Sequence, residues 1–128
     1  KIQPIWADHY FKTISNAKMG LNLSRGEAIK YYSSDRITQI VGNGLVCLID
    51  EKTKYRDYFD DKEMVFYKNE NDLSEKIIRI SRDEKLRKSI ARKGKVKYMK
   101  YFNSTVVADF IIEKTIGLQS KKKYFWHN

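Results

Sequence analysis

Two serines and an arginine stand beside a short amphipathic segment, in the stretch YYSSDRITQIVGNGLVCLID. The spacing of its apolar residues predicts a helix over residues 35–44. The N-terminus of a helix offers unpaired N–H groups and a partial positive charge, and the hydroxyls of Ser33 and Ser34 would add donors. The guanidinium of Arg36 is a planar fork that matches phosphate oxygens. These residue types, in this order, could hold a diphosphate.

The same residues also fit a purely structural interpretation. Ser34 or Asp35 would then serve only as the N-cap of the helix, and Arg36 would pair with a nearby acid. The sequence Gly-Asn-Gly at 42–44 has a backbone role first, because the chain must leave the helix and turn at once into a strand. The residues alone leave both interpretations open.

The elements that must position these side chains alternate along the chain. We expect helices at 7–17, 35–44, 53–59, 69–82, 83–102 and 103–116, and strands at 18–24, 45–50 and 63–68. The run LVCLID at 45–50 is apolar almost throughout, which is typical of a strand buried on both faces of a parallel sheet. Strands that alternate with helices form right-handed crossovers, so the predicted class is α/β, a small parallel sheet with helices on both faces.

The ends and interiors of two helices allow more specific expectations. The helix at 69–82 would be capped by Asn71 or Asp72. The next helix, at 83–102, contains Gly94, which we expect to weaken or bend its second half. Both helices carry leucine and isoleucine at helical spacing, so each should turn one apolar face toward the core.

The totals favour one folded domain that has either an anionic partner or a solvated basic face. The chain has 128 residues, 41% of them hydrophobic, and a single proline, which fits one globular domain. Its net charge is +10, and an anionic partner would be nucleic acid, a phosphorylated ligand or an acidic membrane surface. One cysteine, Cys47, and two histidines exclude a disulfide framework or a zinc cluster within the chain. No stretch is apolar over the roughly 18 residues that span a bilayer.

Positive charge is concentrated toward the end of the chain. Eight lysines or arginines and no acid lie between Lys85 and Lys100. On a helix these charges would form one solvated face, or a surface that docks to anionic lipid. The tail SKKKYFWHN would add a basic and aromatic contact at a membrane interface, be disordered, or pack on a neighbour.

Several segments, taken in order, resemble a known family. AKMGLNLSR, YYSSDRITQIVGNGLVCLIDE, EMVFYKNENDLSEKI and SRDEKLRKSIARKGKVKYMKYFNS are together similar to the C-terminal domain of GT-B fold glycosyltransferases, of the "glycosyl transferases group 1" type. The pattern D-x-x-L-R-x-x-I-A-x-x-G is matched by Asp83, Leu86, Arg87, Ile90, Ala91 and Gly94. The order of the segments is more specific than any one of them, and the resemblance covers most of the chain.

The resemblance implies a Rossmann-like domain, the partial C-terminal half of a GT-B glycosyltransferase, that binds a nucleotide-diphosphate sugar. The sugar would be transferred to a glycan or lipid-linked acceptor in the synthesis of cell-surface polysaccharide or glycolipid. The diphosphate would lie at the start of the helix over 35–44, and the implied binding residues are Arg25, Ser33, Ser34, Arg36 and Gln39. Gln39 and Tyr31 stand where retaining members of a two-glutamate subgroup carry their glutamates, so that subgroup is not supported.

The implied organisation is a donor-binding domain over 1–117 and a basic, aromatic tail over 118–128. We expect the N-terminal half of the fold, which usually supplies the catalytic base, to be missing, so this piece would be inactive alone and no base is named. Asp8, His9 and His127 are expected to be structural or exposed. No cofactor or metal is expected; the donor is a substrate.

The partners and location follow the same resemblance. The nucleotide-sugar donor is the expected ligand, an anionic membrane surface is a second candidate partner, and a homodimer is a third. A bacterial protein in the cytoplasm, peripheral on the inner face of the membrane, would fit these partners. Two other functions stay open at this point, a non-catalytic assembly domain and a basic nucleic-acid-binding module, although the chain carries no RRM, KH or helix-turn-helix signature.

Overall fold

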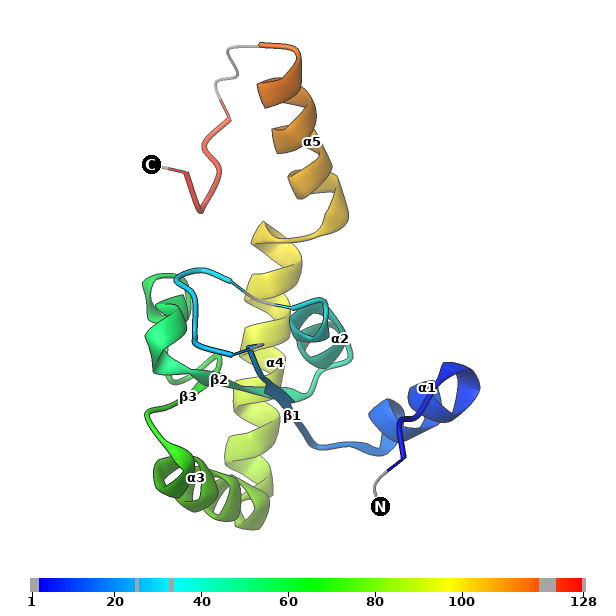
Figure 1. The fold of residues 1–128 in the computed structure, drawn as a ribbon, viewed down its shortest axis with the longest axis vertical. Helices are drawn as coiled ribbons and strands as arrows, with labels where there is room; N and C mark the ends of the chain where they lie inside the picture. Colours follow the sequence, from blue (N-terminus) through cyan, green and yellow to red (C-terminus); the bar gives the residue numbers. More distant parts are fainter. Residues whose placement is uncertain (1–2, 25, 33, 118–121, 128) are drawn as a thin grey trace.

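The computed structural model describes residues 3–24, 26–32, 34–117 and 122–127. Helices and strands follow one another in the expected order (Figure 1). They are α1 (Ala7–Asn16), β1 (Met19–Asn22), α2 (Arg36–Gly42), β2 (Val46–Asp50), the 3-10 turns η1 (Glu51–Thr53) and η2 (Tyr55–Asp57), β3 (Val65–Tyr67), α3 (Glu70–Arg82), α4 (Glu84–Tyr101) and α5 (Ser104–Thr115). No helix in the described part of the chain has the length and apolar character that a bilayer crossing requires.

The strands form one parallel sheet in the order β1-β2-β3, which confirms the predicted α/β class. Gly20 of β1 pairs with Cys47 of β2, and Ile49 of β2 pairs with Phe66 of β3. The central strand is buried along its length except at its last residue, Asp50, which is partly exposed. Its apolar run therefore serves as predicted, because both faces of the sheet are covered.

Alternate side chains of β2 enter two hydrophobic clusters, one on each face of the sheet. Val46 belongs to the cluster that contains Ile80 of α3. Its neighbour Cys47 belongs to the other cluster, with Ile40 of α2 and Phe59 from the segment that follows η2. The sheet is thus a middle layer between α3 on one side and α2 with the 3-10 turns on the other (Figure 1).

The long helix α4 belongs to both clusters. Its Ile90 lies in the cluster of α3, whereas its Tyr98 lies in the cluster of α2. Between them Gly94 faces the backbone just before β3, where a Cβ atom at Gly94 would lie 2.2 Å from the carbonyl oxygen of Glu63. Helix α4 therefore crosses the sheet at the amino ends of the strands. The helix continues unbroken through Gly94, and the close contact with Glu63 gives this glycine a packing role that the sequence did not indicate.

Two expectations about local structure also differ from the result. The N-cap of α3 is Asn69, whose side-chain oxygen accepts a hydrogen bond from the N–H of Asp72 at 3.0 Å, so the expected cap at Asn71 or Asp72 was placed too far along the chain. The helix expected at 53–59 forms as the two 3-10 turns, separated by Lys54 in the left-handed conformation with φ of 59°. A left-handed residue cannot continue a helix, which accounts for the break.

The two ends of the described chain are held differently. No residue of α1 is buried, and Trp6 and Phe11 are exposed. The tail residues 122–127 lie against the end of α4, where the ring of Phe125 stacks on Tyr101 with centroids 4.4 Å apart. The described part of the tail therefore packs on its own chain, an arrangement that the sequence analysis did not name.

Candidate functional site

A cavity of about 730 Å³ lies where all three strands end. Its lining residues are Leu21, Leu23, Asp50, Lys52, Tyr67, Lys68, Asn69, Glu70, Asn71 and Leu73. Leu21 and Leu23 flank the end of β1, Asp50 ends β2 and Tyr67 ends β3. We call this space the carboxyl-edge cavity, because ligands of open α/β sheets bind at this edge.

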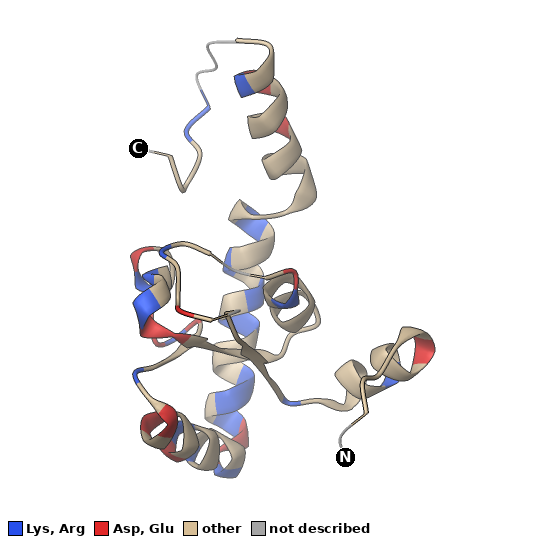
Figure 2. Ribbon diagram, in the orientation of Figure 1, with Lys and Arg blue, Asp and Glu red and all other residues tan. Residues whose placement is uncertain are grey.

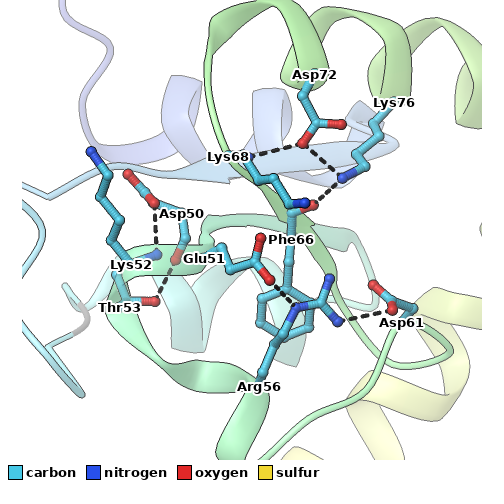
Figure 3. Close-up of polar contacts among 10 residues, drawn as sticks. All are labelled: Asp50, Glu51, Lys52, Thr53, Arg56, Asp61, Phe66, Lys68, Asp72 and Lys76. Atoms are coloured by element: carbon cyan, nitrogen blue, oxygen red, sulfur yellow. Dashed lines mark hydrogen bonds and ion pairs between the residues drawn. The ribbon is translucent and has the colours of Figure 1, made fainter.

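The end of β2 is fixed by a tight turn (Figure 3). The side chain of Asp50 accepts a hydrogen bond from the N–H of Lys52 at 2.8 Å, and the hydroxyl of Thr53 donates to the carbonyl of Asp50 at 2.6 Å. These bonds turn the chain away from the sheet directly after the strand. As a result, Asp50 and Lys52 both line the cavity, and the cavity gains a carboxylate and an ammonium group.

The end of β3 is fixed by Asp72 in the first turn of α3 (Figure 3). One carboxylate oxygen of Asp72 accepts from the N–H of Lys68 at 2.9 Å and from the ammonium of Lys76 at 2.8 Å. Lys76 also donates to the carbonyl of Phe66 at 2.6 Å. The hydrogen bond from Lys76 is the main cause that lowers the pKa of Asp72, followed by the bond from the Lys68 N–H. This network holds the segment 68–71 along the cavity.

A third network braces the loop after β2 without lining the cavity. The guanidinium of Arg56 pairs with Glu51 and Asp61, each at 2.8 Å, and lies over the ring of Phe66 at 4.4 Å from its centroid (Figure 3). The hydrogen bond with Asp61 is the largest cause that raises the pKa of Arg56. Both acids are used by Arg56, so we assign this cluster a structural role.

At the end of β1 the structure brings together two of the predicted binding residues. The hydroxyl of Ser34 donates to the buried side-chain oxygen of Asn22 at 3.0 Å. The Nε of Arg36 donates to the Ser34 hydroxyl at 3.1 Å, and its Nη2 donates to the carbonyl of Leu23 at 3.2 Å. Because Leu23 lines the carboxyl-edge cavity, Ser34 and Arg36 lie beside its β1 end.

The remaining predicted residues lie elsewhere or outside the described part. Gln39 is farther along α2, and its side-chain carbonyl accepts a hydrogen bond from the hydroxyl of Tyr10 in α1. The structure thus groups Ser34 with Arg36 and leaves Gln39 apart from them. Arg25 and Ser33 lie outside the described residues. Asp35 occupies the N-cap position of α2, but its side chain makes no capping hydrogen bond.

Several cavity residues were not predicted from the sequence to belong to a binding site. Lys52, Tyr67, Lys68, Asn69 and Asn71 all line the cavity. Each stands at, or within a few residues beyond, the end of an apolar strand, and that position was a usable signal because the carboxyl ends of parallel strands share one edge. Among the described residues no group of His, Cys, Asp or Glu could hold a metal ion.

Comparison with known proteins gives one match. A family model described as "Glycosyl transferase-like" matches residues 1–113. No curated protein matches the chain, and neither does any solved structure. The match covers every helix and strand from α1 to α4 and most of α5, so it includes the whole carboxyl-edge cavity.

Proposed function

The chain belongs to the glycosyl transferase-like family, and on that premise we propose that the carboxyl-edge cavity binds a nucleotide-diphosphate sugar. The sugar is the donor for transfer to a glycan or lipid-linked acceptor. The cavity formed jointly by the ends of β1, β2 and β3 is the observation that carries this proposal. In this proposal the chain supplies the donor site, and another domain supplies the acceptor site and the catalytic base.

The size and lining of the cavity support a ligand of this class. Its volume of about 730 Å³ lies within the range of about 300 to 1,000 Å³ found for small-molecule sites. The positively charged ammonium groups of Lys52 and Lys68 would attract the negatively charged diphosphate. The carboxylates of Asp50 and Glu70, and the amide of Asn71, can accept or donate hydrogen bonds to sugar hydroxyls.

Arg36 would reach the diphosphate from the β1 side of the cavity. Two of its N–H donors are used by Ser34 and Leu23, and a guanidinium has five. Those two bonds fix the direction of the side chain, which is exposed to solvent beside Leu23. A positioned, exposed guanidinium suits phosphate recognition because less of its conformational freedom remains to be lost on binding.

The test is equilibrium binding of UDP and of GDP to the chain, measured by titration calorimetry and by chemical-shift changes of cavity amides. We expect one nucleotide to bind at one site and to shift the amides of residues 50–52 and 67–71. A chain that bound neither nucleotide at millimolar concentration would contradict the proposal. A dimer without nucleotide binding would instead favour an assembly role.

A further inference from the structure

A second cavity lies at the opposite, amino edge of the sheet. It has a volume of about 370 Å³, and its lining residues are Ala17, Lys18, Gly44, Arg87, Lys88, Ala91, Arg92 and Lys95. Lys18 precedes β1, Gly44 precedes β2, and the others except Ala17 belong to α4. We call it the amino-edge cavity. It shares no lining residue with the carboxyl-edge cavity.

Arg87 is the unusual member of the amino-edge cavity. Its side chain is only 10% exposed, although a charged group is costly to remove from water unless it is paired and hydrogen-bonded. Its one ion pair is with Glu84, at 3.9 Å, which is too long for a hydrogen bond. Within the described part of the chain the guanidinium of Arg87 has no hydrogen-bond acceptor. Its N–H donors are therefore available to an anion that enters the cavity.

The surroundings of Arg87 are also positively charged. Five cationic side chains and no carboxylate line the cavity. The nearest acid, Glu84, lies 2.7 Å from the ammonium of Lys88, so one carboxylate serves both Lys88 and Arg87. The pKa of Glu84 is lowered, first by its hydrogen bond with Lys88 and then by the charges of Lys88, Arg87 and Lys18. Figure 2 shows how densely lysine and arginine follow α4.

The shape of the site restricts what can fill it. Most of the lining comes from successive turns of α4, and the chain closes the other side with Lys18 and Gly44. Gly44 has a φ of 76°, and a Cβ atom there would contact the side chain of Lys95 at 3.7 Å, so Lys95 lies over this glycine. The cavity volume of about 370 Å³ is about half that of the carboxyl-edge cavity, which leaves room for a phosphate group together with a small organic group.

We propose that the amino-edge cavity binds a phosphate group, with the fork of Arg87 on two of its oxygens and Lys18, Arg92 and Lys95 around it. Arginine suits this role because its planar donors match phosphate geometry, and the bound anion would give the buried guanidinium the acceptors it lacks. The phosphate belongs to a small soluble ester or to a phospholipid headgroup, two sources of the same chemistry. This site is independent of the proposed donor site.

The first experiment titrates the chain with inorganic pyrophosphate at constant ionic strength, followed by calorimetry and amide shifts. We expect saturable binding that shifts residues 17–18, 44 and 87–95. The double variant R92Q/K95Q should weaken binding by about tenfold or more, the scale of a lost charge-assisted hydrogen bond. The control is K85Q, which removes one exposed charge of α4 that does not line the cavity, so the losses are compared per charge removed.

An equal loss of binding free energy per removed charge in K85Q and in R92Q/K95Q would overturn the proposal, because it would mean diffuse attraction to a basic helix. Binding to a 20-base-pair DNA duplex without saturable pyrophosphate binding would overturn it too. The variant R87K tests the fork directly if it retains the unfolding midpoint of the parent chain. Lys68→Ala, at the other edge, should leave pyrophosphate shifts at residues 87–95 unchanged.

A second experiment distinguishes the two sources. Vesicles of phosphatidylcholine alone and of phosphatidylcholine with 30% phosphatidylglycerol are sedimented with the chain and with R92Q/K95Q. Retention on the anionic vesicles that R92Q/K95Q loses and K85Q keeps assigns the phosphate to a lipid headgroup. Pyrophosphate binding without retention on either vesicle assigns it to a soluble ester.

Discussion

Gly94 of α4 lies directly against the carbonyl of Glu63, so close that a methyl group at Gly94 would sit 2.2 Å from that oxygen. The contact joins the long helix to the backbone that leads into β3. No side chain fits between them. The contact explains why a glycine occupies the interior of an 18-residue helix, where its intrinsic effect is unfavourable.

Gly94→Ala should therefore destabilise the chain, by about 2 kcal/mol or more, because main-chain atoms rather than a flexible side chain must move. Urea unfolding followed by circular dichroism would measure the change. The matched control is Gly42→Ala in α2, where a Cβ atom meets nothing within 4 Å. That substitution should stabilise by up to about 1 kcal/mol. Equal effects at the two glycines would refute the packing explanation.

Asn69→Ala should lower the free energy of unfolding by about 1 kcal/mol, because it removes the cap that Asp72 N–H uses. Asn71→Ala, two positions later, removes an amide that makes no cap and should change stability by much less. Urea midpoints of the two variants give the comparison. A larger loss of stability in Asn71→Ala than in Asn69→Ala would mean that Asn71 is the cap, as the sequence analysis expected.

Lowering the pH should weaken the hydrogen bonds by which Asp72 joins the end of β3 to α3. Its pKa is lowered in the folded chain by the Lys76 and Lys68 hydrogen bonds, so its contribution is fully present above the ordinary aspartate value of about 4 and is lost as pH falls through the lower folded value. The sign follows because the unfolded chain binds the proton more tightly. Asp72→Asn should flatten the fall in stability between about pH 4 and pH 2. An unchanged slope in urea unfolding over that range would contradict this.

Cys47 should be unreactive while the chain is folded. Burial raises the pKa of its thiol to about 12, and the residue is 1% exposed in the centre of the sheet. The thiolate is the reactive form, so a thiol reagent at pH 8 should modify Cys47 only when the chain opens. The labelling rate should rise with urea in step with unfolding. Fast labelling in the absence of urea would mean that β2 is accessible.

Lys68→Ala should weaken nucleotide binding at the carboxyl-edge cavity by about tenfold if the ammonium of Lys68 interacts with the diphosphate. The side chain is exposed, and its backbone N–H bond with Asp72 survives the substitution. Lys62→Ala removes an exposed lysine outside that cavity and should bind as the parent chain does. Parallel titrations with UDP and GDP make the measurement. Equal weakening in both variants would assign the effect to net charge.

Much of the fold was predictable because hydrophobic periodicity reports burial. The apolar run at 45–50 became the central strand, and Leu73 and Ile77 of α3 pack against the cluster beneath it. What was missed includes a contact between residues distant in sequence and an unusual local backbone conformation. The sequence around Gly94 does not indicate that the carbonyl of Glu63 lies against it. The sequence around Lys54 does not indicate that this residue adopts a positive φ.

The site was predictable in part, for a similar reason. Ser34 and Arg36 were identified by residue type, and the structure places both at the end of β1. Lys68 and Asn69 follow a strand of only three residues, so their place at the sheet edge depends on the partner strands. Arg87 matched a position of the family pattern, but the sequence did not show that it is the buried cation of its helix.

Helix α4 has a mechanical consequence for the molecule. Its Ile90 and Tyr98 belong to clusters on opposite faces of the sheet, so a single rigid rod is anchored in both. Neither hydrophobic cluster can unfold alone unless the part of α4 that packs in it is released. Amide hydrogens near the middle of α4 should accordingly exchange only through whole-molecule opening, and the two faces should behave as one cooperative unit on unfolding.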